Sequence, residues 1–148
     1  TTVAALVSVV VLMFGRTDVS EHMTLEGRAT VDGGRVIVSG STSLPDGALL
    51  EVTVRDPEGG LIPAEDPILV RHGSFAASIA MPEGVHAAID TDSSDVLVTF
   101  EIVMEDRSQP SELIERFGGI GQRMTADETA QTGHGRRLIW RLPLEDRP

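Results

Sequence analysis

The run Asp90-Thr91-Asp92-Ser93-Ser94-Asp95 has the residue types and the spacing that come nearest to a ligand site in this chain. Together with Glu101 it supplies oxygen-bearing side chains at positions 1, 3, 5 and 12 of the loop that binds calcium in EF-hands. Asp95 stands where that loop needs glycine, and the next residues predict a strand instead of a helix, which argues against an EF-hand. Two interpretations stay open: a calcium-binding loop of Asp90, Asp92 and Asp95, or a polar turn before a strand.

Other catalytic or metal-binding patterns are missing from the sequence. The chain has no cysteine, which excludes disulfides, thiolate metal sites and lipid-bearing cysteines. Its histidines, His22, His72, His86 and His134, have no partner at metal-site spacing, and no Gly-x-Ser-x-Gly pattern of a hydrolase occurs. Gly118-Gly119-Ile120-Gly121 would follow a helix, where it ends the helix and does not cradle a phosphate. We therefore expect no catalytic residues, no cofactor and no enzyme activity.

Composition and charge limit the classes of partner. A chain of 148 residues with 41% apolar side chains is sufficient for one domain with a buried core. Its 23 acidic residues outnumber 12 basic ones, so the formal net charge is −11. A field of that sign repels phosphate backbones and anionic lipid surfaces. We therefore expect no nucleic-acid partner.

The first fifteen residues, TTVAALVSVVVLMFG, carry no charge and would be apolar on every face of a helix. We interpret residues 1–15 as a transmembrane anchor. At about 1.5 Å per residue they span roughly 22 Å, less than the roughly 30 Å of a bilayer's hydrocarbon core, so the helix is expected to begin upstream of Thr1. Two alternatives stay open: a secretory signal peptide, although Gly15-Arg16-Thr17-Asp18 offers no small-x-small cleavage site, and an N-terminal strand of the folded domain.

The residues around this anchor predict its orientation and its neighbours. Arg16 is followed by Asp18, Glu21 and Glu26, and this acidic flank favours the non-cytoplasmic side for the rest of the chain. Small side chains let transmembrane helices approach closely. The residues expected to contact the bilayer or a partner helix are Ala4, Ala5, Ser8, Val11 and Phe14. We therefore expect a single-pass membrane protein, with residues 16–24 as a polar connector.

Beyond residue 24 the chain alternates between short apolar runs and turn residues, a spacing typical of an all-β sandwich. Apolar side chains in these runs recur at every second residue, as in Leu50, Val52 and Val54. Gly33-Gly34 and His72-Gly73 are typical of hairpin turns. The expected strands are residues 25–32, 35–43, 50–55, 67–71, 74–81, 95–105 and 136–145. We expect residues 25–148 to form one sandwich of about seven or eight strands.

A helix and a loop interrupt this pattern. Pro110 suits the first turn of a helix, and Leu113 and Phe117 lie one helical turn apart, so we expect a short helix near residues 110–117. Residues 124–133 contain no apolar run, and we expect them to form an acidic loop.

One stretch carries a family resemblance. Gly40-Ser41-Thr42-Ser43-Leu44-Pro45-Asp46-Gly47 matches a G-x-T-x-L-P-D-G pattern in which a strand leads into a tight turn. Later pieces of the same pattern are His72-Gly73-Ser74-Phe75, Met81-Pro82-Glu83-Gly84, Gln109-Pro110 and Phe117-Gly118-Gly119-Ile120-Gly121. Over roughly residues 35–125 the chain therefore resembles uncharacterised bacterial envelope proteins. The resemblance implies an immunoglobulin-like domain displayed from a membrane or lipid anchor and no catalytic residues, although this chain lacks the cysteine that carries the lipid in many such proteins.

Two hypotheses for the function follow. In the first, the protein is a non-catalytic accessory or structural subunit that is anchored in a bacterial cell membrane. Its sandwich lies on the periplasmic or extracellular side and contacts other subunits of a larger membrane complex, for example a respiratory or photosynthetic one. Residues 1–15 would then contact the lipid bilayer and neighbouring membrane subunits. In the second, the protein is a free-standing envelope module that binds a solute or calcium through Asp90–Asp95. The sequence favours the first hypothesis over the second, and both over an enzyme.

Overall fold

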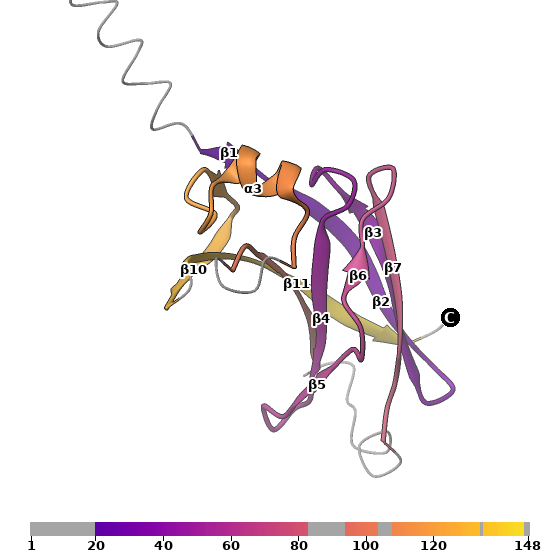
Figure 1. Cartoon of the computed structure of the whole chain (residues 1–148). Coiled ribbons are helices and arrows are strands. Elements are labelled where there is room, and N and C mark those ends of the chain that lie inside the picture. Colours follow the sequence, from indigo (N-terminus) through magenta and orange to yellow (C-terminus); the bar gives the residue numbers. More distant parts are fainter. Residues whose placement is uncertain (1–19, 83–93, 104–107, 134, 147–148) are drawn as a thin grey trace, which may run out of the picture.

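The computed structural model describes residues 20–82, 94–103, 108–133 and 135–146, and strands make up most of them (Figure 1). The expected transmembrane residues 1–15 lie outside these ranges. No helix within the described ranges is long and apolar enough to cross a membrane. In chain order the elements are β1 (Glu21–His22), β2 (Leu25–Asp32), β3 (Arg35–Thr42), β4 (Leu49–Arg55), β5 (Leu61–Pro63), β6 (Ile68–Leu69), β7 (Ser74–Ala80), β8 (Asp95–Glu101), α3 (Ser111–Phe117), β9 (Met124–Thr125), β10 (Glu128–Thr132) and β11 (Gly135–Asp146).

Two groups of described strands meet at β11. One group is β2, β3 and β7, and the other is β5, β4, β8 and β11, with β10 paired to the first part of β11. Residues 137–143 of β11 pair antiparallel with β8, whereas residues 144–146 pair parallel with residues 29–31 of β2. The long strand β11 therefore carries the sheet from one group to the other. The result is a curled, all-β sheet, which agrees with the sandwich class predicted from the sequence (Figure 1).

The core is built from every second residue of the strands. Because successive side chains of a strand point to opposite faces, the predicted alternation places Leu50, Val52 and Val54 together in the interior. Burial of such a side chain stabilises the fold by roughly 1.5–3 kcal/mol. The rings of Phe100 in β8 and Phe117 in α3 meet edge to face, with centroids 6.2 Å apart and an interplanar angle of 76°. This contact holds α3 against the sheet.

Two hairpin turns lie where the sequence predicts them. Gly33 and Gly34, between β2 and β3, have φ angles of 56° and 84°, which match a type I′ turn and which glycine adopts without strain. His72 and Gly73, with φ angles of 51° and 72°, turn the chain between the bridged residues Arg71 and Ser74. The Gly33–Gly34 turn joins β2 to β3 and sets the register in which these two strands pair.

The short helix expected near residues 110–117 is α3. It begins at Ser111, directly after Pro110, and it buries Leu113 and Phe117 against the sheet. Gly118 follows with a φ angle of 94°, and its N–H donates to the Ile114 carbonyl. A glycine in this conformation ends the helix.

Two strands, β9 and β10, occupy most of residues 124–133, so the prediction of a loop was wrong. β10 pairs antiparallel with the start of β11, and β9 pairs parallel with β1, which lies within the expected connector 16–24. β10 has no large apolar side chain, and its stability comes from the long neighbouring strand and not from its own sequence. Met124 of β9 is fully buried and ties this region to the core.

Candidate functional site

The strand β7 ends the path of the described sheet, and only β3 pairs with it along its length among the described strands. Its sequence, Ser-Phe-Ala-Ala-Ser-Ile-Ala, contains no charged residue and no proline. Edge strands are usually protected by a charge, a proline or a bulge that prevents another strand from pairing with them. The residues of β7 itself carry no charge and no proline, and no other described strand pairs with its outer edge.

Backbone hydrogen bonds identify the groups that face this edge. Ser74 exchanges both of its backbone hydrogen bonds with Arg71, at 3.0 Å each, whereas the Met81 N–H donates to the carbonyl of Gly34 beside β3, at 2.9 Å. The backbone groups of successive residues in a strand point to alternate sides. The N–H and C=O groups of Ala76, Ser78 and Ala80 therefore point away from β3, toward the free edge.

A groove of about 430 Å³ lies beside the second half of this edge. Ser78, Ile79 and Ala80 of β7 form one wall, and residues 63–68 between β5 and β6 form the other. Arg35 lines the groove as well, and it donates from Nε to the Ser78 hydroxyl at 2.8 Å and from Nη2 to the Ser78 carbonyl at 3.5 Å. One side of the groove is therefore a strand edge to which no described strand pairs.

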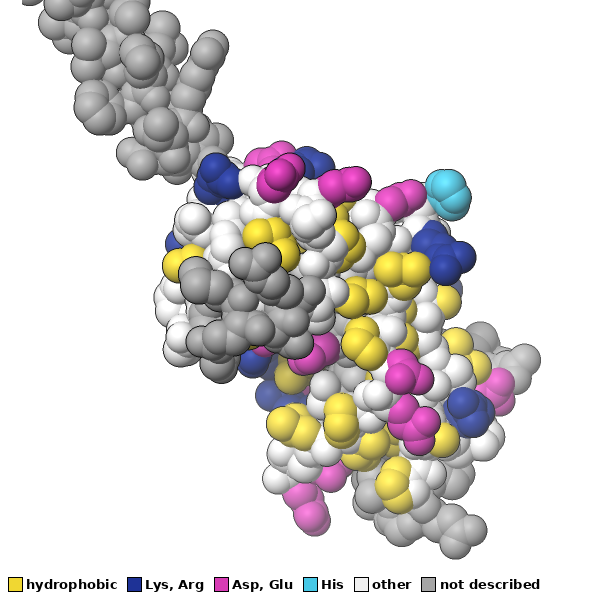
Figure 2. All heavy atoms as spheres, in the orientation of Figure 1, with side chains coloured by type: hydrophobic (Ala, Val, Ile, Leu, Met, Phe, Trp, Pro, Cys, Tyr) yellow, Lys and Arg dark blue, Asp and Glu magenta, His cyan; other side chains and the backbone are white. Residues whose placement is uncertain are grey.

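Apolar and acidic side chains share the face beside the groove. Leu61 and Leu69, 62% and 37% exposed, lie at the two ends of the β5–β6 segment, Leu61–Leu69. Glu65 and Asp66 of this segment line the groove and have no ion-pair partner among the described residues. Figure 2 shows hydrophobic side chains running down this side of the molecule with acidic side chains among them. The surface thus combines an apolar strip with unpaired negative charge.

Of the predicted calcium ligands Asp90, Asp92 and Asp95, only Asp95 lies within the described residues, and it pairs with an arginine. Arg55 donates from Nε to Asp95 Oδ1 at 2.8 Å and from Nη2 to Oδ2 at 2.6 Å, and the Asp95 side chain is 20% exposed. Asp90 and Asp92 lie outside the described residues. Within the described ranges, no cluster of three or more histidine or acidic side chains is arranged to hold a metal ion. The calcium loop stays a prediction.

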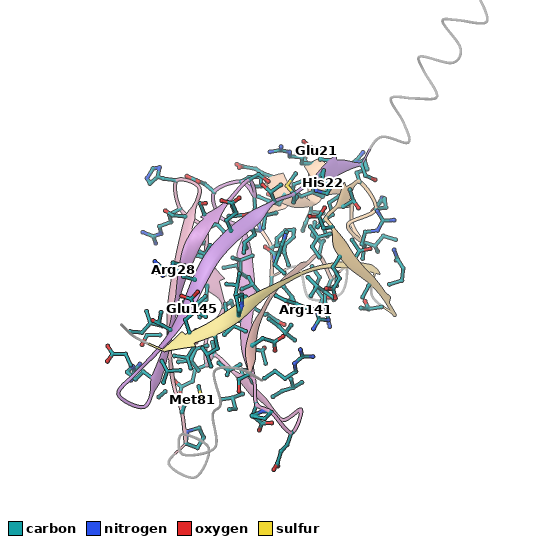
Figure 3. All side chains as sticks on the ribbon, turned by 180° about the vertical axis from the view of Figure 1, so that it is seen from behind. Glu21, His22, Arg28, Met81, Arg141 and Glu145 are labelled. Atoms are coloured by element: carbon teal, nitrogen blue, oxygen red, sulfur yellow. The ribbon has the colours of Figure 1, made fainter. Side chains whose placement is uncertain are left out.

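Two more arginines neutralise carboxylates on the outer surface of β8, β10 and β11. Arg141 donates from Nε and Nη2 to the two carboxylate oxygens of Glu128, at 2.8 Å each (Figure 3). These hydrogen bonds lower the pKa of Glu128 and raise the pKa of Arg141. Arg137 Nη2 lies 3.0 Å from Glu101 Oε1. Charges on this surface are thus matched across neighbouring strands.

The residues that follow the predicted anchor are tied to α3 and β9. The Glu21 N–H donates to the Arg123 carbonyl at 2.9 Å, and the Met23 N–H donates to the Thr125 carbonyl at 2.7 Å. Arg116 of α3 donates to both carboxylate oxygens of Glu21, at 2.8 Å each, and these bonds lower the pKa of Glu21 (Figure 3). The end of the domain nearest residue 20 is therefore held by backbone and side-chain contacts.

The other sequence-predicted residues add no converging group. The predicted membrane-facing residues Ala4, Ala5, Ser8, Val11 and Phe14 lie outside the described residues, and so do His86 and His134. His22 Nε2 lies 3.2 Å from Asp127 Oδ1, and His72 is exposed in the turn before β7. The helix contacts therefore stay predictions.

Gln109 is a buried polar residue that sequence reasoning missed. Its Oε1 accepts from the Leu49 N–H at 2.9 Å, and its Nε2 donates to the carbonyls of Leu49 and Glu101 at 2.8 and 3.1 Å. The side chain thus satisfies backbone groups of both β4 and β8. Its position before Pro110 in the resembled pattern was the only signal, and it does not indicate this role.

Comparisons with known proteins give no match for this chain. Family models, curated proteins and solved structures were all searched, and none is similar to it. The case for a function therefore rests on the residues and their geometry.

Proposed function

We propose that the protein is a non-catalytic, membrane-anchored accessory or structural subunit whose sandwich contacts other proteins. One observation carries this proposal: no described strand pairs with the outer edge of the uncharged strand β7, and this edge lies beside a groove lined by apolar and acidic side chains. Unprotected edges of this kind are a common route by which one protein pairs with another.

The order of the strands supports an immunoglobulin-like domain as the finer fold. Such domains place their first, second and fifth strands in one sheet and the third, sixth and seventh in the other. Here β2, β3 and β7 form the first group, and β4, β8 and β11 form the second. The G-x-T-x-L-P-D-G pattern between β3 and β4 adds to this support.

The apolar run Thr1–Gly15 supports the membrane part of the proposal. Its residues form a transmembrane anchor that contacts the lipid bilayer, with Ala4, Ala5, Ser8, Val11 and Phe14 facing lipid or a neighbouring helix. The domain then lies on the periplasmic or extracellular side of a bacterial cell membrane, as the acidic flank favours. Its partners are other subunits of a membrane complex, for example a respiratory or photosynthetic one.

The second candidate, a free-standing module that binds calcium or another solute, has less support. The observation in its favour is the oxygen-rich run Asp90–Asp95. Against it, Arg55 already engages both carboxylate oxygens of Asp95. Millimolar calcium that raises the melting temperature of the protein would favour this candidate, and an unchanged melting temperature would remove it.

The experiment that tests the first candidate is gentle detergent extraction from the native membrane, followed by native mass spectrometry. A photo-crosslinking residue at Ser78, on the β7 edge, is compared with one at Gln131, on the exposed part of β10. We expect a stoichiometric complex with other membrane subunits and cross-links to them from position 78 in preference to position 131. Recovery of the chain alone, without cross-links from either position, would contradict the proposal.

A further inference from the structure

We propose that an extended, basic segment of a partner protein adds to β7 as the next strand of the sheet. This inference rests on the proposed function and names the site and the chemistry of the contact. The N–H groups of Ala76, Ser78 and Ala80 and the C=O groups of Ala76 and Ala80 supply the main-chain hydrogen bonds, whereas the Ser78 C=O accepts from Arg35. The groove between β7 and residues 63–68 receives the side chains of the added strand.

The shape of β7 suits an added strand. Its outward side chains are small, because alanine and serine alternate with the buried Phe75, Ala77 and Ile79. Nothing bulky therefore projects from this face of the strand beside the free backbone groups. Arg35 is the one basic side chain among the groove-lining residues. It donates to the Ser78 hydroxyl at 2.8 Å and to the Ser78 carbonyl at 3.5 Å, so it engages the acceptor of Ser78 and not its N–H.

The other outer edges are less suitable. β5 has three residues and ends at Pro63, which has no N–H to donate. β10 begins with Glu128, whose carboxylate is engaged by Arg141. β7, by contrast, offers seven uncharged residues in register with β3. Among the strand edges that the structure describes, β7 is therefore the one best suited to a partner.

Charge decides which kind of segment binds. Glu65 and Asp66 line the groove without an ion-pair partner among the described residues, and the whole chain carries a net charge of −11. Lysine or arginine at the ends of the incoming strand would meet these carboxylates and would be drawn in by the field of the protein. The remaining residues of the segment are uncharged, with apolar side chains at alternate positions that face Ile68.

A second copy of this chain is the less suitable occupant. Its own β7 contains no basic residue that could pair with Glu65 and Asp66. Two copies paired through β7 would also bring two strongly acidic domains together, which costs free energy through charge repulsion. The observations therefore favour a basic partner over self-association.

The binding test uses the full chain in detergent micelles and two synthetic peptides. Both alternate valine and threonine, and one has lysine at both ends where the other has glutamate. We expect the lysine peptide to bind at least about tenfold more tightly and to slow amide hydrogen exchange at Ala76, Ser78 and Ala80. Equal binding of the two peptides, or no protection of these amides, would overturn the inference.

Variants locate the contact on the edge. Ser78→Pro removes an outward N–H, whereas its matched control Ser78→Ala removes only the hydroxyl that contacts Arg35. We expect the proline variant to lose about tenfold or more in affinity for the lysine peptide and the alanine variant to lose little. Equal affinities of the two variants, both folded, would refute strand addition.

A charge exchange tests the partner class without altering the backbone. The double variant Glu65→Lys with Asp66→Lys should bind the glutamate peptide more tightly than the lysine peptide. The control, Glu26→Lys with Glu58→Lys, changes the net charge by the same amount at positions away from the groove and should keep the preference for the lysine peptide. A concentration-dependent dimer protected at β7 without peptide would overturn the inference in favour of a second copy. A native complex that persists in the Ser78→Pro variant would likewise refute it and leave the proposed function standing.

Discussion

The strands β4, β8 and β11 differ from the outer edge of β7 in whether their polar groups have partners within the described residues. On these three strands, Arg55 and Asp95 pair across neighbouring strands, and Gln109 satisfies the backbone of Leu49. On β7, the backbone groups of Ala76, Ser78 and Ala80 lack a described strand to pair with. Polar groups that are already paired have little to offer a partner. An edge with unpaired groups beside a groove has main-chain hydrogen bonds to offer.

The largest expected effect comes from removing the aromatic side chain that packs β7 against the core. Phe75 is buried and is the only aromatic side chain of β7. We expect Phe75→Ala to lower the free energy of unfolding by about 3–5 kcal/mol, because it leaves a cavity in the core. Denaturant titration followed by linear extrapolation measures this value. Ala76→Ser, at the exposed neighbouring position, is the control and should change it by less than about 0.5 kcal/mol. A loss below about 1 kcal/mol for Phe75→Ala would show that β7 is not held through the core.

The next effect tests the hydrogen bonds by which Gln109 links β4 and β8. We expect Gln109→Ala to lower the free energy of unfolding by about 1–3 kcal/mol, because it leaves backbone groups of Leu49 and Glu101 without partners. Gln109→Glu should cost at least as much, since it sets a carboxylate against two carbonyl oxygens. Denaturant titration again gives the values, and Ser108→Ala, at the exposed preceding residue, is the control. An unchanged stability in both Gln109 variants would mean that water replaces the side chain without loss.

A smaller effect is expected for the pair Arg55 and Asp95. Both side chains are partly exposed, so screening by solvent reduces the strength of their two hydrogen bonds. A double-mutant cycle with Arg55→Ala and Asp95→Ala should give a coupling energy of about 1 kcal/mol. A coupling of zero would show that Asp95 is free for another ligand. The same Asp95→Ala variant would then be the one to compare with the parent in a calcium titration.

The same contrast explains how far the sequence predicted the structure. Alternation in Leu50, Val52 and Val54 and the glycines Gly33 and Gly34 depend on local geometry, so the class of fold, the hairpins and the short helix were predicted correctly. β10 was missed because its stability comes from β11 and not from its own residues.

The candidate site was harder to predict, because it depends on contacts distant in the chain. Arg55 and Asp95 are 40 residues apart, and Gln109 and Leu49 are 60 residues apart, so no local pattern links them. That β7 lies at an edge is a property of the sheet order and not of the run Ser74–Ala80. The missing charge in this run is visible in the sequence, but its meaning depends on that position.

The smallest expected effect concerns pH and the paired surface carboxylates. Hydrogen bonds from Arg116 lower the pKa of Glu21, and those from Arg141 lower the pKa of Glu128, both from an ordinary value of 4.5. A carboxylate whose pKa is lower in the folded state binds fewer protons there than in the unfolded state. Its contribution to stability is therefore complete above about pH 4.5, and it is lost as the pH falls through the pKa of the folded state. The double variant Glu21→Gln with Glu128→Gln should therefore lose less melting temperature than the parent as the pH falls below that value. Binding of a peptide at the β7 edge should be unchanged in this variant. Glu26→Gln with Glu58→Gln removes two carboxylates that have no arginine partner among the described residues, so this variant should lose melting temperature with falling pH as steeply as the parent does. An acid slope that stays the same in the first double variant would mean that solvent screens these pairs completely, and the contrast with β7 would then rest on backbone groups alone.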